Sequence, residues 1–229
     1  MKLGEQRLRD VDIRNALCEK LRKDHSLSRG TIILEEFGCN EARADLAVVN
    51  GSLHCFEIKS GADRLDRLKN QIPAFSAVFD KITLVVDSRH SEKAVSVSPE
   101  WWGIIEATRA GRRIRLRQTR PESGNPSLNG LALAKMLWRR EAYRLLKQHN
   151  LHQGLKNALA KKMWQAISDG LPPTLIAEFL RSAITERGGS GFRKPLFQSG
   201  DSYPKPPNRR RSPENPHSPP ARRSPRHRH

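Results

Sequence analysis

The stretch of residues 43–59, RADLAVVNGSLHCFEIK, constrains the fold of this chain more than any other. Two runs rich in apolar and β-branched residues flank Asn50-Gly51, a strong short-range signal for a β-hairpin. Asp45 lies on the first predicted arm, and Glu57 and Lys59 lie on the second. Because side chains alternate between the two faces of a strand, Glu57 and Lys59 are expected to share one face.

The length of the turn decides whether Asp45 joins that face. A three-residue loop of Asn50, Gly51 and Ser52 places Asp45 opposite Glu57, where paired Cβ atoms lie about 4.5–5.5 Å apart. Two carboxylates at that separation can hold one divalent cation. A two-residue loop would shift the pairing by one residue and place the two acids on opposite faces.

The rest of the hairpin argues against an exposed strand face with scattered charges, which is the usual setting of charged residues. The even positions, His54 excepted, are apolar: Ala44, Leu46, Val48, Phe56 and Ile58. The odd positions are apolar near the turn and charged only at the far end. Both faces are therefore predicted to be covered. Two carboxylates gathered at one end would repel each other unless a cation lies between them, so the pattern predicts a metal site.

The chain carries a large positive excess, because 42 Lys and Arg against 24 Asp and Glu give a formal charge of +18 over 229 residues. Such an excess favours a polyanionic partner, either nucleic acid or an acidic membrane surface. No apolar run approaches the ~20 residues of a membrane span, and Met1 precedes charged sequence instead of a signal peptide. We therefore expect a cytoplasmic protein with no membrane span, and the charge alone leaves nucleic acid and an acidic membrane surface open as partners. Cys18, Cys39 and Cys55 lack a C-x-x-C spacing and are expected to be reduced core thiols.

The order of the predicted elements indicates an α/β fold, with a central mixed sheet flanked by helices. The expected elements are a helix over 4–23, a strand over 31–37, the hairpin, a helix opened by a Ser60–Asp63 capping box and interrupted by Pro73, a buried strand over 81–87, and an edge hairpin ending at 113–118. In the Trp101-Trp102 pair at most one ring can stack on a ligand, and we expect core packing.

Two further regions follow the sheet. Residues 128–187 show only helical patterning, in three predicted helices with many basic residues that form either a solvated face or a binding surface. Residues 188–229 hold nine of the fifteen prolines and ten Lys or Arg against two acids, which predicts disorder. We therefore divide the chain into an α/β domain over 1–127, a small all-α subdomain over 128–187 and a disordered Pro-, Arg- and Ser-rich basic tail over 188–229.

An Asp on one strand and a Glu-x-Lys on the next suit metal-dependent hydrolysis of a phosphodiester. Carboxylates are hard oxygen ligands for Mg²⁺ or Mn²⁺. The metal polarises the phosphate and lowers the pKa of a bound water. A lysine on the same face can orient or deprotonate that water and offset the charge of the transition state.

On these residues the sequence resembles the PD-(D/E)XK, or restriction-endonuclease-like, nuclease superfamily, with Asp45 as its first acid and Glu57-Ile58-Lys59 as its E-x-K. It is similar in particular to a family of bacterial and phage proteins within that superfamily, with R-x-D, E-I-K-S, R-L-x-x-Q and W-W-G-I motifs. The matching stretches here are Glu36-Phe37-Gly38, Arg43-Ala44-Asp45-Leu46-Ala47, Glu57-Ile58-Lys59-Ser60, Arg67-Leu68-Lys69-Asn70-Gln71 and Trp101-Trp102-Gly103-Ile104.

The resemblance implies a restriction-endonuclease-like sheet, an Mg²⁺ (or Mn²⁺) cofactor and hydrolysis of DNA. It implies a metal held by Asp45, Glu57, Ile58 and Glu36, with Glu35 the less favoured choice for that last acid. It also implies that Gln71 points from its helix into the site, against the alternative of an exposed helix amide. Pro73 and the basic tail depart from the family pattern.

We therefore expect a DNA endonuclease or exonuclease of repair, restriction or phage-linked defence, with Asp45, Glu57, Lys59, Glu36 and Gln71 as catalytic residues. The alternative is a catalytically silent nuclease fold that binds nucleic acid or a partner. Complete acids together with Lys59 favour the enzyme. An acidic-membrane-binding protein rests on charge alone. The tail is either a phosphate tether or an extension without a role, and the sequence leaves the oligomeric state open, a homodimer included.

Overall fold

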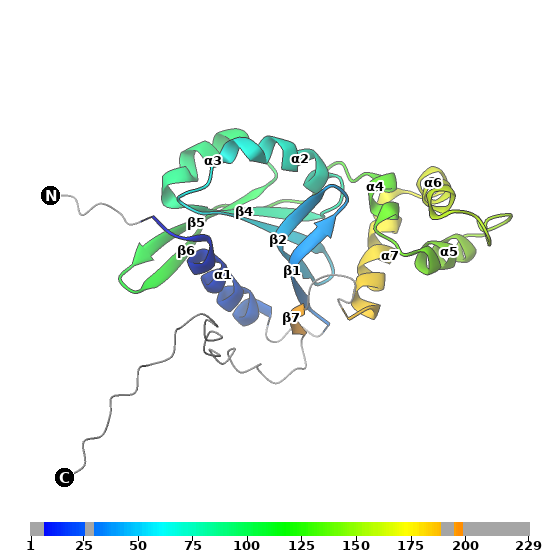
Figure 1. Cartoon of the computed structure of the whole chain (residues 1–229), viewed down its shortest axis with the longest axis horizontal. Coiled ribbons are helices and arrows are strands. Elements are labelled where there is room, and N and C mark those ends of the chain that lie inside the picture. Colours follow the sequence, from blue (N-terminus) through cyan, green and yellow to red (C-terminus); the bar gives the residue numbers. More distant parts are fainter. Residues whose placement is uncertain (1–6, 26–29, 189–194, 199–229) are drawn as a thin grey trace, which may run out of the picture.

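One seven-stranded mixed sheet forms the centre of the computed structural model, which describes residues 7–25, 30–188 and 195–198. The strands lie in the order β6-β5-β4-β3-β2-β1-β7 (Figure 1). β3, β4 and β5 are parallel, and all other neighbours are antiparallel. The strands are β1 Ile32–Cys39, β2 Ala42–Val49, β3 Leu53–Lys59, β4 Lys81–Asp87, β5 Gly103–Ala110, β6 Arg113–Arg120 and β7 Pro195–Gln198.

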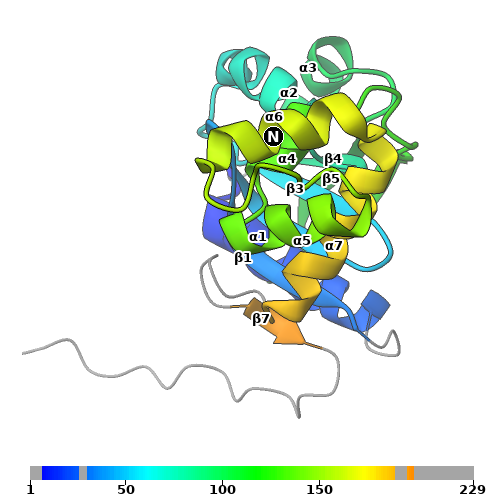
Figure 2. The same ribbon diagram turned by 90° about the vertical axis from the view of Figure 1, so that its right-hand side faces the viewer.

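Helices cover both faces of the sheet and one of its ends. α1 lies against one face and α2 and α3 against the other, while α4 to α7 form a separate group at one end (Figures 1 and 2). The helices are α1 Asp10–His25, α2 Leu68–Ser76, α3 Ser91–Val97, α4 Gly130–Lys135, α5 Arg139–Gln148, α6 Ala160–Gly170 and α7 Pro173–Glu186, with 3-10 turns η1 Leu65–Arg67 and η2 Ser88–His90. Within the described residues, no helix has both the length and the apolar character that crossing a bilayer requires.

The predicted hairpin is present, and its register is the one that a three-residue loop requires. β2 and β3 pair from Leu46↔Phe56 to Val49↔Leu53. The loop closes through the main-chain N–H of Asn50, which donates to the carbonyl of Ser52 at 3.0 Å. Gly51 has φ of +65°, a conformation that glycine adopts without steric cost.

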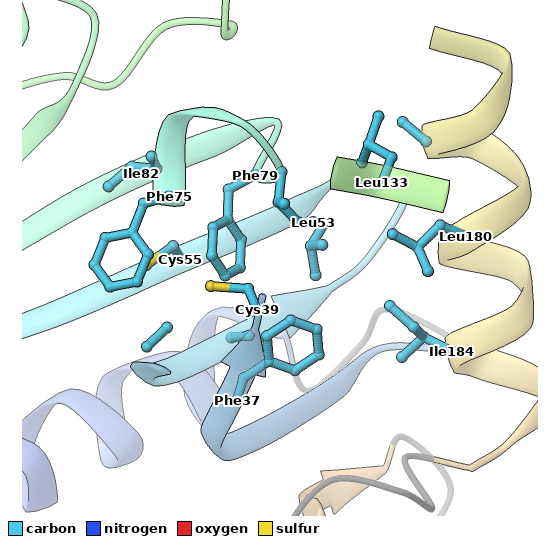
Figure 3. Close-up of a cluster of buried hydrophobic side chains, with 14 of the residues drawn as sticks. Phe37, Cys39, Leu53, Cys55, Phe75, Phe79, Ile82, Leu133, Leu180 and Ile184 are labelled. Carbon is cyan, nitrogen blue, oxygen red and sulfur yellow. The ribbon is translucent and has the colours of Figure 1, made fainter. Parts of the chain in front are cut away.

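Two hydrophobic clusters lie on the two faces of the sheet. One packs β3 residues Leu53 and Cys55 beneath α2 and continues into α4 to α7 (Figure 3). The other packs Phe56 and Ile58 of the same strand against α1. The prediction that both faces of the hairpin are covered is therefore confirmed. All three cysteines are buried free thiols, as expected.

The α/β class, the mixed sheet between helices and the helical C-terminal region are confirmed. The helix predicted over 4–23 begins at Asp10, and three further boundaries differ from the prediction. The Asp63 carboxylate accepts hydrogen bonds from the main-chain N–H and Oγ of Ser60, which closes a turn, and the helix begins only at Leu65. The first of the three helices predicted over 128–187, expected to carry both Leu133 and Leu145, is divided into α4 and α5, because the extended residue Trp138 is capped by Glu141.

The third difference concerns the segment over 188–229 that the sequence predicts to be disordered. Within it, β7 pairs antiparallel with β1. This pairing provides hydrogen-bond partners for main-chain groups along the outer side of β1. Amino-acid composition contains no information about such a pairing. Residues 189–194 and 199–229 of the predicted tail lie outside the described residues.

Candidate functional site

Three predicted site residues meet at the carboxyl end of β3. Glu57 and Lys59 extend from the sheet face that α2 covers, and Gln71 extends from α2. Lys59 Nζ donates to Glu57 Oε1 at 2.6 Å and to Gln71 Oε1 at 3.0 Å. Gln71 Nε2 donates to the same Glu57 oxygen at 2.8 Å, so the three side chains form a closed hydrogen-bonded group. Gln71 therefore points inward and is not an exposed helix amide.

Glu57 is buried with one carboxylate oxygen left over. Its side chain is 4% exposed, and Oε2 has no hydrogen-bond partner among the residues that the structure describes. Burial, and then the negative charge of Asp45, raise the pKa of Glu57 to about 7, against the opposing effects of Lys59 and Gln71. A buried carboxylate with an unpartnered oxygen is costly and calls for a positive partner.

Asp45 lies where β2 and β3 separate. Its Oδ2 accepts the main-chain N–H of Ile58 at 2.8 Å, so this side chain takes the place of a strand-to-strand hydrogen bond beyond the Leu46↔Phe56 pair. Its Oδ1 is 2.6 Å from Nη2 of Arg14, a residue of α1. Asp45 is therefore held between the two strands, beside Glu57 and in contact with α1.

Glu36 lies opposite Asp45 on β1, at a break in the regular strand pattern. The two residues stand between the pairs Glu35↔Leu46 and Phe37↔Ala44, and Glu36 has φ of +52°. At this position the alternation of side chains between the two faces of the sheet shifts by one residue in both strands. For this reason Ala44 packs in the cluster beneath α2, and not with Leu46 as strict alternation predicts.

Glu36 forms ion pairs with two arginines and does not form a metal site together with Glu57. Its Oε2 is 2.8 Å from Arg43 Nε, and its Oε1 is 3.6 Å from Arg14 Nη1. Glu35, the less favoured choice, lies on the other side of the sheet: burial raises the pKa of Cys18 on α1, and the nearby negative charge of Glu35 raises it further.

The acids that could hold a metal are therefore two, Asp45 and Glu57. Across residues 7–25, 30–188 and 195–198, no group of three or more His, Cys, Asp or Glu side chains is arranged to hold a metal ion. The unpartnered Oε2 of Glu57 fits a hard cation, and the carboxylate of Asp45 beside it is a ligand of the same kind. Ile58 could contribute only its carbonyl oxygen, because its side chain is apolar and its N–H is a hydrogen-bond donor, here to Asp45.

A cavity of about 660 Å³ opens beside Lys59 and Gln71. Its walls also include Arg64 and Arg67, which come from the segment that leads into α2. One lysine and two arginines around a concave opening suit an anionic ligand such as a phosphate.

Comparison with known proteins places this chain in a phage family. Residues 4–194 match the sequence profile of bacteriophage P4 protein cII. Protein cII of Enterobacteria phage P4 is 33% identical over 182 residues, which cover 79% of this chain and 68% of that protein. The chain belongs to the phage P4 cII family. A solved structure, a protein of unknown function from Silicibacter pomeroyi, aligns with a TM-score of 0.38 at 16% identity over 69% of this chain and 100% of its own. A likeness at that level carries no functional argument.

Arg14 is a further residue of the site in this family member, and it is not evident as one from the usual reading of its sequence. Arg14 resembles one half of an exposed helical ion pair, because Asp10 lies four positions earlier and its Oδ1 is 3.2 Å from Arg14 Nε. Its position in the helix carries the missed signal. Arg14 precedes Leu17, Cys18 and Leu21 at spacings of three, four and seven residues, so it continues the buried stripe of α1. A cation at the end of an apolar stripe indicates a buried carboxylate partner.

Proposed function

We propose that this chain is a metal-dependent nuclease of the PD-(D/E)XK type, which hydrolyses phosphodiester bonds in DNA with Mg²⁺ or Mn²⁺. The observation that carries the proposal is Glu57. It is a buried carboxylate beside Asp45, with one oxygen held by Lys59 and Gln71 and the other without a partner. A cation between the two acids would relieve their repulsion and satisfy that oxygen.

Each residue of the group has a role in this reaction. Asp45 and Glu57 would hold the metal, which polarises the phosphate and lowers the pKa of a bound water. Lys59 Nζ, fixed by Glu57 and Gln71, would orient the attacking water and offset negative charge on the phosphate. Arg64 in the wall of the cavity would bind a neighbouring phosphate.

Incubation of the purified protein with linear, nicked, branched and single-stranded DNA, each with Mg²⁺, Mn²⁺ or EDTA, tests the proposal. We expect cleavage that EDTA abolishes. Asp45→Asn should abolish cleavage, whereas Asp169→Asn, which alters an exposed acid of α6, should leave it intact. Full cleavage by the Asp45→Asn variant would refute the assignment.

The catalytically silent binding module is the second candidate, and Arg14 favours it. This guanidinium neutralises Asp45 and reaches Glu36, so two of the predicted acids already have a cation from the protein itself. Calorimetric titration with Mn²⁺ separates the two candidates. A nuclease binds Mn²⁺ as the wild type, and Arg14→Met strengthens that binding by freeing Asp45. A silent module binds Mn²⁺ only after Arg14 has been replaced.

Charge and family membership support the proposed setting. The formal charge of +18 suits a nucleic-acid substrate, and a relative of this chain is a phage protein. A nuclease of phage-linked repair, restriction or defence would act on DNA in the bacterial cytoplasm.

A further inference from the structure

The hairpin of β5 and β6 lies at the same end of the sheet as the candidate site. β3, β4 and β5 are parallel, so their carboxyl ends lie together at one end of the sheet, away from α4 to α7 (Figure 1). The register runs from Lys59 to Val86, from Val86 to Glu106 and from Glu106 to Arg117. Arg117 is therefore three strand spacings from Lys59, or about 14 Å.

Two arginines of this hairpin face the same side of the sheet as Lys59. Ile114 and Leu116 of β6 pack against the cluster beneath α1. The alternating residues Arg115 and Arg117 point to the opposite face, where Glu57 and Lys59 lie. They stand about 7 Å apart and extend outward from the level of Lys59. Arg113, at the turn, lies instead beside Arg112 in a hollow against α1, near Glu19.

Half of the six arginines in residues 103–120 are engaged within the protein, since Arg109 pairs with Asp12 at 3.6 Å and Arg117 and Arg120 also have partners. Arg112, Arg113 and Arg115 are exposed, and in the part of the chain that the structure describes no ion pair or hydrogen bond engages their side chains. Arg117 pairs with Glu106 at 3.0 Å. Arg120 differs, because its guanidinium donates to the carbonyls of Trp102 and Pro99 and to Ser98 and so fixes the base of the hairpin.

We infer that the β5–β6 hairpin binds the phosphate backbone of double-stranded DNA beside the candidate site, an inference that rests on the proposed nuclease function for the choice of DNA. Residues 103–120 contain six arginines and one acid, which gives a net charge of +5. They contain no aromatic residue on which an unpaired base could stack, and stacking is the main contact to single strands. A rigid two-stranded ribbon with a row of guanidinium groups suits phosphates of a duplex.

The spacing agrees with one continuous duplex. The step of about 7 Å from Arg115 to Arg117 spans about two phosphates of one strand, at about 3.4 Å of helix axis per phosphate. The distance of about 14 Å from Lys59 to Arg117 is less than half of one turn of DNA, which is about 34 Å. A duplex held by the hairpin can therefore present a phosphodiester to Lys59 and Glu57 at the same time.

Binding of a fluorescent 30-base-pair DNA duplex and of its single strand, measured by anisotropy in EDTA over a range of salt, tests the inference independently of cleavage. The variant Arg112→Gln/Arg113→Gln/Arg115→Gln removes three exposed charges that have no protein partner, so the fold should be retained. We expect duplex binding to weaken by about 100-fold at 0.1 M salt. The slope of log K against log salt should decrease by about 2.7, which is 0.9 for each phosphate contact.

The matched control is Lys147→Gln/Lys161→Gln/Lys162→Gln, which removes the same charge from exposed positions of α5 and α6 at the other end of the molecule. This variant should bind like the wild type. Equal losses of duplex affinity in both variants would show a general charge effect. A loss in the control alone would show that α5 and α6, and not the hairpin, contact DNA. If the hairpin variant loses duplex binding and single-strand binding equally, the inference that the hairpin recognises double-stranded DNA is refuted. If the hairpin variant loses binding while the wild type cleaves nothing, the inference holds and the nuclease proposal fails.

Discussion

Replacing Glu57 by glutamine should stabilise the metal-free protein. Burial and Asp45 raise the pKa of Glu57 from 4.5 to about 7, so between these values the folded protein holds a proton that the unfolded chain has released. The stability of the wild type therefore falls as pH rises from 4.5 to 7. Above pH 7 the folded protein carries the full penalty of about 3 kcal/mol, at 1.36 kcal/mol for each pH unit between the two pKa values.

Urea unfolding in EDTA at pH 5 and pH 8 measures this effect. At pH 8 we expect Glu57→Gln to be more stable than the wild type by about 1–3 kcal/mol, because the amide avoids the penalty but loses its charged hydrogen bond from Lys59. At pH 5 the two proteins should differ less. Mn²⁺ at 100 times its Kd should then stabilise the wild type by about 2.7 kcal/mol and the variant by less.

Glu106→Gln is the matched control, since Glu106 lies on the same face of the sheet two strands away. Hydrogen bonds from Ser91 and Arg117 lower the pKa of Glu106, so its replacement should destabilise the protein at pH 8. If Glu57→Gln is also less stable than the wild type in EDTA at pH 8, the argument that this carboxylate needs a cation is refuted.

Three further predictions concern the lysine, a half-buried histidine and the basic C-terminal segment. Lys59→Met should abolish turnover while calorimetry still detects Mn²⁺ binding, and a parallel loss of Mn²⁺ affinity would assign Lys59 a structural role. Burial lowers the pKa of His54 to about 3, so the wild type should lose stability as pH falls from 6.5 towards 3, by up to about 1.4 kcal/mol per pH unit. In urea unfolding, the stability of His54→Gln should fall less steeply than that of the wild type as pH decreases. An equal dependence on pH would contradict a neutral, half-buried ring. Removal of residues 199–229, which carry a net charge of +6, should flatten the salt dependence of DNA binding, and an equal slope would show that this segment does not contact DNA.

The hairpin shows how far the sequence predicts the site. The Asn50-Gly51 signal predicts the hairpin but leaves two registers open, of which the structure has the one with a three-residue loop. The alternation of residues predicts the two covered faces and the shared face of Glu57 and Lys59. These features follow from local turn chemistry and from a period of two residues, both of which are visible in sequence. Gln71 was placed by the resemblance, and the structure brings it to Lys59.

The irregular part of the site could not be predicted in the same way. Asp45 bonds to a main-chain N–H of the next strand, and Glu36 adopts a left-handed conformation that is uncommon for a residue with a side chain. Strand alternation contains no information about either feature. Arg14 reaches Asp45 across 31 positions, and β7 pairs with β1 across more than 150. Such contacts depend on tertiary packing, which a pattern within one segment does not encode.

The hydrophobic cluster beneath α2 has a consequence for how deletions of this protein should be interpreted. It runs without interruption from Phe37 of β1 and Phe75 of α2 to Leu180 of α7 (Figure 3). In addition, Asp80 forms an ion pair with Arg181 of α7 at 3.0 Å. A chain that ends at residue 127 would leave this apolar surface open to water. Loss of activity after such a deletion would therefore report unfolding and aggregation, and would say nothing about contacts between the helices and a substrate. Only substitutions of exposed side chains can assign a role to these helices.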